Sequence, residues 1–122
     1  MIRGSVNARC EATVRLPLKD AKGEEQPVEG IIDTGFNGSL TLSRETIRQL
    51  GLLWRTRGNA VLANGAVDQF DICAAIVIWD GAPRSILVEE VETMPLVGMA
   101  LLRGHHLSIR VVDGGSVTIA AL

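Results

Sequence analysis

A strict alternation near the start of the chain narrows the fold more than any other sequence feature. From Ala8 to Leu18 every second residue is apolar, and the residues between them are mostly polar. Strand side chains alternate between two faces, so this pattern is typical of a half-buried β-strand. The polar segment 19–26 contains a glycine and should turn the chain into a second strand at Val28–Ile32. The sequence therefore predicts a hairpin that ends at Asp33.

A short helix is predicted over Arg44–Leu50. Ser43 can cap its first turn, and Gly51 can end it in a left-handed conformation. Downstream, Asn64-Gly65 lies between two apolar runs, which predicts a projecting hairpin closed by a type I′ turn.

The rest of the chain is predicted to add strands and one more short helix. Ile72–Trp79 and Ser85–Val91 should form strands joined by Asp80–Pro83, and the acidic residues near position 90 should form a solvated face. A helix is expected over Met99–Arg103, ending at Gly104. Turn residues 113–115 separate two final apolar strands, Leu107–Val112 and Ser116–Leu122. The pattern is mostly β, with two short helices and no interdomain linker.

Length and charge limit the class of protein. The chain has 122 residues, which favours one domain spanning 1–122. Its net charge is −2 and its arginines are dispersed, so no nucleic-acid partner is expected. The longest apolar run, Ile72–Trp79, is far shorter than the roughly 20 residues of a membrane-spanning helix. The first residues lack the apolar segment of a signal peptide, and the protein is expected to be cytoplasmic and not membrane-bound.

The segment Gly30–Gly35 carries the clearest chemistry. Two isoleucines precede Asp33-Thr34-Gly35, so a buried strand delivers a carboxylate onto a tight glycine turn. Alone, the triplet also suits an aspartate that merely shapes a turn or caps a helix. Its surroundings add a hairpin before it, a helix and an Asn-Gly hairpin after it, and then Leu96-Val97-Gly98 followed by a short helix.

This order of features, from Ala8 to Leu122, resembles the retropepsin-like family of aspartic proteases. The resemblance implies a mostly-β, closed-barrel acid-protease fold and an endopeptidase that needs no cofactor or metal. It implies that Asp33 is the catalytic carboxylate and that Thr34 forms hydrogen bonds across a subunit boundary. It also implies that Gly35 lets the backbone come close to the substrate and to the partner's loop. Two further groups have implied roles: a substrate-binding flap tip (Ala63, Asn64, Gly65) and active-site support beneath the Asp loop (Leu96, Val97, Gly98).

A homodimer follows from the chemistry of peptide hydrolysis. One carboxylate must take a proton from the attacking water while another donates a proton to the carbonyl oxygen. The chain has no second Asp-Thr-Gly or Asp-Ser-Gly, so a two-fold copy is the simplest source of the second group. The family resemblance further implies that the two chain termini interleave with those of the partner, and that the substrate is a peptide or protein.

Two departures from the family pattern keep other hypotheses open. Phe36 follows the Asp-Thr-Gly triplet where the family often has Ala or Ser, and Met99-Ala100 replaces a polar residue that often ties the dimer together. The alternatives are a catalytically weak or inactive peptide-binding module of the same fold, and a monomeric scaffold in which Asp33 only shapes a turn. Four other residues are given no chemical role. The adjacent His105 and His106 have no partner to complete a metal site and are interpreted as structural or surface residues, and Cys10 and Cys73 are interpreted as packed in the core.

Overall fold

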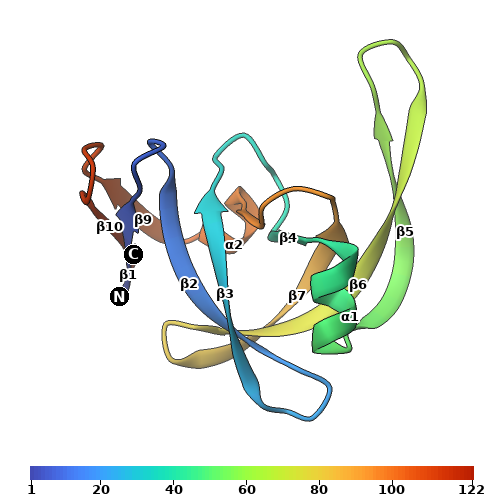
Figure 1. The fold of residues 1–122 in the computed structure, drawn as a ribbon, viewed down its shortest axis with the longest axis horizontal. Helices are drawn as coiled ribbons and strands as arrows, with labels where there is room; N and C mark the ends of the chain where they lie inside the picture. Colours follow the sequence, from blue (N-terminus) through green and yellow to red (C-terminus); the bar gives the residue numbers. More distant parts are fainter.

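The computed structural model describes residues 1–122 and is built mainly from β-strands (Figure 1). Along the chain the elements are β1 (Ile2–Val6), β2 (Ala12–Lys19), β3 (Glu25–Ile32), β4 (Leu40–Leu42), α1 (Arg44–Leu50), β5 (Leu53–Val61), β6 (Val67–Trp79), β7 (Ala82–Glu90), β8 (Leu96–Val97), α2 (Met99–Leu102), β9 (His105–Ile109) and β10 (Ser116–Ala121). The predicted mostly-β class with two short helices is confirmed. Neither helix has the length and apolar character required to cross a membrane.

All strands belong to one mixed sheet, in the order β5-β6-β7-β4-β8-β3-β2-β1-β10-β9. β6 also pairs with β2, at Val77 and Leu18, so the strands from β6 round to β2 form a ring. Two pairs are parallel, β3 with β8 and β4 with β7. The sheet therefore curls on itself and encloses an apolar interior.

Alternating side chains fill this interior. On β2, Val14, Leu16 and Leu18 are at most 2% exposed, as the alternation predicts. Other strands contribute in the same way, from β6 (Cys73, Ala75, Val77, Trp79) and β10 (Val117, Ile119). Because the chain has few aromatic residues, aliphatic side chains supply most of the core.

The first strand of the hairpin begins later than predicted. β2 starts at Ala12, and residues 7–11 form a turn because Asn7 Oδ1 accepts hydrogen bonds from the backbone N–H groups of Arg9 and Glu11, both 3.0 Å. Cys10 lies in this turn with φ 61° and is exposed, so its predicted core position is wrong. Cys73 is buried as predicted.

The terminal strands pair within the chain. β1, which no sequence pattern predicted, lies between β2 and β10, and β10 lies between β1 and β9. Both hydrogen-bonding edges of β1 and of β10 are therefore occupied. Interleaving of these termini with those of a partner stays a prediction, and it would not use the paired edges of β1 and β10.

Two turns differ from the prediction. At the Asn64-Gly65 hairpin only Gly65 has positive φ, 83°, and Leu62 N–H donates to Ala66 O across a longer loop. The turn with two positive φ residues lies instead at Asp80 and Gly81, so β7 starts at Ala82.

The last hairpin also differs, since β9 runs over His105–Ile109 and not to Val112. Residues 110–115 form a loop whose ends are joined by the hydrogen bond from Arg110 N–H to Ser116 O. The predicted hairpin is present, but its loop is longer and its first strand begins and ends earlier.

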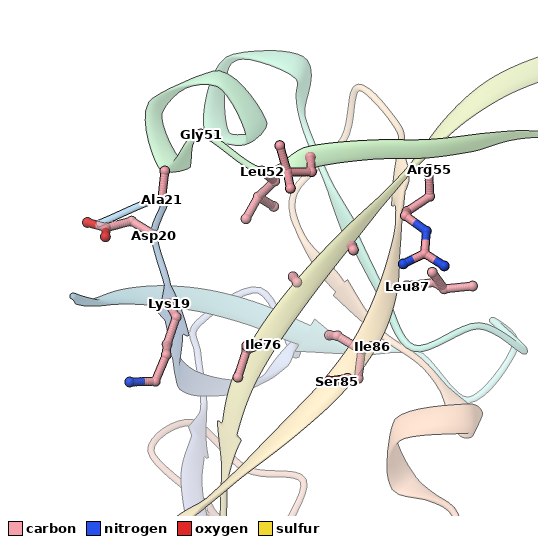
Figure 2. Close-up of a pocket in the computed structure, with 13 residues that line it drawn as sticks. Lys19, Asp20, Ala21, Gly51, Leu52, Arg55, Ile76, Ser85, Ile86 and Leu87 are labelled. Atoms are coloured by element: carbon pink, nitrogen blue, oxygen red, sulfur yellow. The ribbon is translucent and has the colours of Figure 1, made fainter. Parts of the chain in front are cut away.

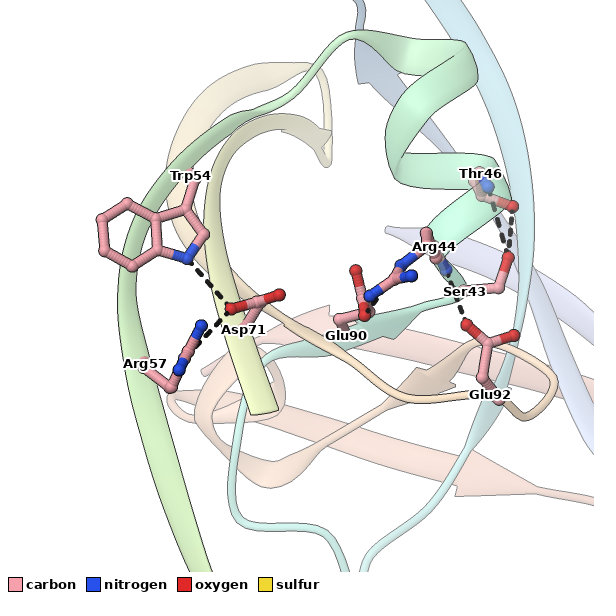
Figure 3. A network of polar contacts seen from close by, with 8 residues as sticks. All are labelled: Ser43, Arg44, Thr46, Trp54, Arg57, Asp71, Glu90 and Glu92. Atoms are coloured by element: carbon pink, nitrogen blue, oxygen red, sulfur yellow. Dashed lines mark hydrogen bonds and ion pairs between the residues drawn. The ribbon is translucent and has the colours of Figure 1, made fainter. Parts of the chain in front are cut away.

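The predicted helix over Arg44–Leu50 is confirmed. Ser43 Oγ accepts a hydrogen bond from Thr46 N–H, and Gly51 ends the helix with φ 68°. Ile47 and Leu50 are buried against the sheet. As Figure 3 shows, Glu92 Oε1 accepts from Arg44 N–H at 2.9 Å, which ties the start of α1 to the segment after β7.

Candidate active site

Asp33 stands directly after β3, at the head of a backbone turn. Its N–H donates to Val97 O at 2.9 Å, and its carbonyl accepts from Phe36 N–H at 3.1 Å. Its side-chain Oδ1 accepts from Gly35 N–H at 2.9 Å. Asp33 is half-buried, its backbone is hydrogen-bonded on both sides, and its carboxylate accepts one hydrogen bond within the turn.

The segment Leu96–Gly98 lies immediately beneath this turn. Leu96 and Val97 pair with Ile31 and Ile32 in a parallel register, and Val97 also pairs with Leu40. The Asp33 loop (residues 33–39) is thereby held between β3 and β4, with β8 bridging them. The structure thus brings two sequence motifs more than 60 residues apart into one backbone assembly.

The start of α2 binds the far side of the same loop. Gly98 N–H donates to Ser39 O, Met99 N–H to Phe36 O and Ala100 N–H to Gly38 O, at 3.0, 2.8 and 3.1 Å. These bonds satisfy carbonyl groups of an irregular segment that would otherwise lack partners. These hydrogen bonds therefore hold the loop that carries Asp33 in a fixed conformation.

Gly98 is required by the close packing of this assembly. A Cβ at position 98 would overlap the carbonyl oxygens of Gly38 and Phe36 and the Phe36 ring. The ring also lies against Gly38, where an added Cβ would meet Phe36 Cζ. The two glycines therefore make room for the phenylalanine that follows Asp33-Thr34-Gly35.

Thr34 and Gly35 are exposed at the outer end of the turn. The Thr34 hydroxyl takes part in none of the chain's hydrogen bonds, although its neighbours in the loop are extensively bonded. A surface with an available hydroxyl and an unencumbered glycine can be approached closely by another molecule.

Ala63, Asn64 and Gly65 form the exposed tip of the β5–β6 hairpin, whose projecting part is called here the arm (residues 53–72). Figure 1 shows the arm projecting from the body, with its tip clear of the other elements. Its tip hydrogen bonds are internal, including Asn64 Oδ1 accepting from Ala66 N–H at 3.0 Å. The structure does not bring the tip into contact with Asp33.

The middle of the arm is braced by polar side chains. Asp71 Oδ1 accepts from Trp54 Nε1 at 3.1 Å and lies 3.5 Å from Arg57 Nε (Figure 3). Asp71 therefore joins the two strands of the arm, a role that its position in the sequence did not predict.

Glu89 on β7 was missed as a site residue. It was predicted to lie on a solvated face with Glu90 and Glu92, but Glu89 and Glu90 are half-buried. Burial raises the pKa of the Glu89 carboxyl above its ordinary value. Its Oε2 lies beside Gly38 of the Asp33 loop. The local sequence pattern gives no signal that separates Glu89 from the neighbouring acids Glu90 and Glu92.

A separate groove of about 570 Å³ lies on the outer face of β6 and β7, beside the end of α1 (Figure 2). Its lining includes Leu52, Ile76, Ile86 and Leu87, with Lys19 toward one end and Arg55 toward the other. None of the predicted site residues lines it.

The remaining candidates are structural. Trp79 Nε1 and His105 Nε2 are 3.1 Å apart, with the two rings in an edge-to-face arrangement, so His105 supports the core. Burial, together with the charges of Glu90 and Asp71, raises the pKa of the Cys73 thiol. A protonated thiol is a poor nucleophile, which agrees with a packing role.

Comparisons with known proteins identify the fold. No family model and no curated protein matches the sequence. Among solved structures, the chain is similar to a retropepsin-like aspartic protease from Rickettsia conorii, with a TM-score of 0.59 and 17% sequence identity. The match covers 99% of this chain and 91% of that one. At this identity the similarity concerns the fold alone: the chain has a fold similar to that of a retropepsin-like aspartic protease.

Proposed function

We propose that residues 1–122 form one aspartic endopeptidase domain that acts as a homodimer. Paired Asp33 carboxylates from two copies would activate the water that hydrolyses a peptide bond. The observation that carries the proposal is the turn at Asp33-Thr34-Gly35, in which the half-buried Asp33 donates its backbone N–H to Val97 O. The similarity to a retropepsin-like protease fold gives this geometry its context.

The two carboxylates would divide the chemistry between them. One accepts a proton from the attacking water, and the other donates a proton to the oxygen that gains charge as the carbonyl is attacked. At about 4 Å and an effective dielectric constant near 20, two ionised carboxylates repel by roughly 4 kcal/mol. The pair therefore retains one proton over an acidic range, and activity should fall when that proton is lost at higher pH.

The surroundings of Asp33 support the same roles. Thr34 is available for a hydrogen bond across a two-fold axis, and Gly35 leaves the backbone open to close approach. Ala63, Asn64 and Gly65 at the tip of the arm would close over an extended peptide. Leu96, Val97 and Gly98 would keep the Asp33 loop rigid during the reaction.

The test is cleavage of a mixed peptide library by the wild-type protein and by Asp33→Asn, at several protein concentrations and from about pH 3 to 8. Asp33→Asn is nearly isosteric and should fold and dimerise. We expect cleavage only by the wild type, with specific activity that rises with concentration. Products identified by mass spectrometry would give the cleavage sites.

A folded, dimeric wild type that cuts nothing would refute turnover. The alternative is then a peptide-binding module of the same fold, favoured by the Phe36 ring that fills the space beside Gly98 and Gly38. A strictly monomeric protein would leave Asp33 as a turn-shaping residue.

A further inference from the structure

Glu89 occupies an unusual position between the Asp33 loop and the arm. It lies on β7 directly opposite Ile72 of β6, where the strand pair passes into the arm. Val88, its neighbour, is fully buried, so Glu89 projects from the other face of the strand. Its Oε2 reaches Gly38, five residues after Asp33.

The Glu89 carboxylate has no counter-charge within the chain. The ion pairs of the structure join other groups: the N-terminal amine with Asp80, Arg44 with Glu90, and Arg57 with Asp71. No side-chain hydrogen bond involves Glu89 either, whereas Asp71 and Glu92 both accept one. A half-buried carboxylate without a partner loses hydration and gains nothing in return.

The Phe36 ring meets the carboxylate at the same point. A Cβ built on Gly38 would touch both Glu89 Oε2 and Phe36 Cζ, so the two side chains converge over this glycine. A carboxylate beside an aromatic ring suits a cation, which pairs with the former and is attracted to the face of the latter. The absence of a side chain at Gly38 leaves room for Glu89 Oε2 and the Phe36 ring to lie next to each other.

We propose that Glu89, with Phe36, forms a subsite that selects a lysine or arginine side chain of the peptide substrate. This inference rests on the proposed function, because it requires a peptide that runs between Asp33 and the arm. Such a peptide would pass over Gly38, and one of its side chains would reach Glu89. Pairing with the cation offsets the cost of the half-buried carboxylate and thereby favours basic over neutral or acidic peptides.

The first test compares cleavage preferences of the wild type, Glu89→Gln and the control Glu90→Gln. Glu90 is the next residue on β7, is also half-buried, and already pairs with Arg44, Nε to Oε2 3.5 Å. We expect wild type and Glu90→Gln to cut peptides with Lys or Arg at one fixed subsite at least tenfold faster than matched Gln peptides. Glu89→Gln should lose this preference while it still cuts. A preference that survives Glu89→Gln, or a wild type that cuts without any basic preference, would overturn the proposal.

A binding experiment separates this proposal from turnover. The peptides are fluorescent octapeptides with Arg, Gln or Glu at each position in turn in an otherwise apolar background. Asp33→Asn protein is titrated into each peptide, and the rise in fluorescence polarisation gives the dissociation constant. We expect an Arg peptide to bind at least tenfold tighter than its Glu counterpart, and the added Glu89→Gln change to reduce that ratio below about threefold. If the wild type cuts nothing but this pattern holds, the proposed function fails and the subsite stands. Equal binding of Arg and Glu peptides, or no binding of any, overturns the subsite.

Discussion

Individual residues around Asp33 have roles that depend on size more than on polarity. Gly98 and Gly38 are needed because backbone oxygens and the Phe36 ring occupy the space that their side chains would take. Gly35 carries less constraint, since an added Cβ there would approach only Asp33 Oδ1, at 3.2 Å. The backbone of the Asp33 loop is therefore positioned by close packing against the start of α2.

Gly98→Ala should destabilise the protein by about 2–4 kcal/mol, because the new methyl group overlaps backbone oxygens that cannot rotate away. Urea denaturation measures the change. Gly104→Ala is the matched control: its φ is 82°, but no atom lies near the added Cβ, so strain alone should cost about 1 kcal/mol. Equal losses in the two variants would contradict the packing explanation.

Glu89 gives a second residue-level prediction, on the pH dependence of stability. Burial raises its pKa in the folded state above the ordinary value of 4.5, so the folded protein binds more protons than the unfolded chain. Its contribution to stability is present at low pH and is lost as pH rises through the raised pKa. Glu89→Gln should therefore be more stable than the wild type at pH 7, and the difference should shrink toward pH 4. Denaturation midpoints at both pH values test this, and a variant less stable than the wild type at pH 7 would contradict it.

At the scale of elements, short local signals fix where each element starts and stops. α1 has a serine cap, an acidic residue in its first turn and a left-handed glycine at its end. β2 begins only after Asn7 has closed the preceding turn with its side chain. The arm is different, since its strands extend beyond the core and are braced by Asp71.

Ser43→Ala should cost about 1 kcal/mol of stability, because the N–H of Thr46 loses its hydrogen-bond acceptor at the start of α1. Ser43→Asp, which keeps an acceptor and adds a favourable charge at the helix N-terminus, should retain most of the stability. Thermal unfolding of both variants measures the difference. A loss in Ser43→Asp as large as in Ser43→Ala would show that the hydroxyl acts through another contact.

For the whole molecule, the proposed reaction requires two copies, although β1 and β10 already pair within one chain. Contacts between two copies would therefore have to avoid the paired edges of these two strands. The exposed Thr34 at the outer end of the Asp33 loop is the candidate for such a contact.

Thr34→Val should leave the monomer's stability within about 0.5 kcal/mol, because the hydroxyl has no partner in the chain and the residue is exposed. If each copy donates one hydrogen bond across the axis, the dimer should lose about 2 kcal/mol, roughly a 30-fold rise in dissociation constant. Sedimentation equilibrium measures this rise. Thr34→Ser keeps the hydroxyl and should dimerise like the wild type; dimerisation unchanged in Thr34→Val would place the interface elsewhere.

Local patterns in the sequence were enough to predict the mostly-β class, the β2–β3 hairpin ending at Asp33, α1 with its caps, and the presence of the arm. These features depend on side-chain alternation, capping and glycine turns, which act over a few residues. Tertiary structure decided what no local pattern encodes: β1 between β2 and β10, the hydrogen bond from Asp33 to Val97, the space that Gly98 leaves for Phe36, and Glu89 beside Gly38. Each of these depends on segments far apart in sequence, and packing of the ring of strands brings them together.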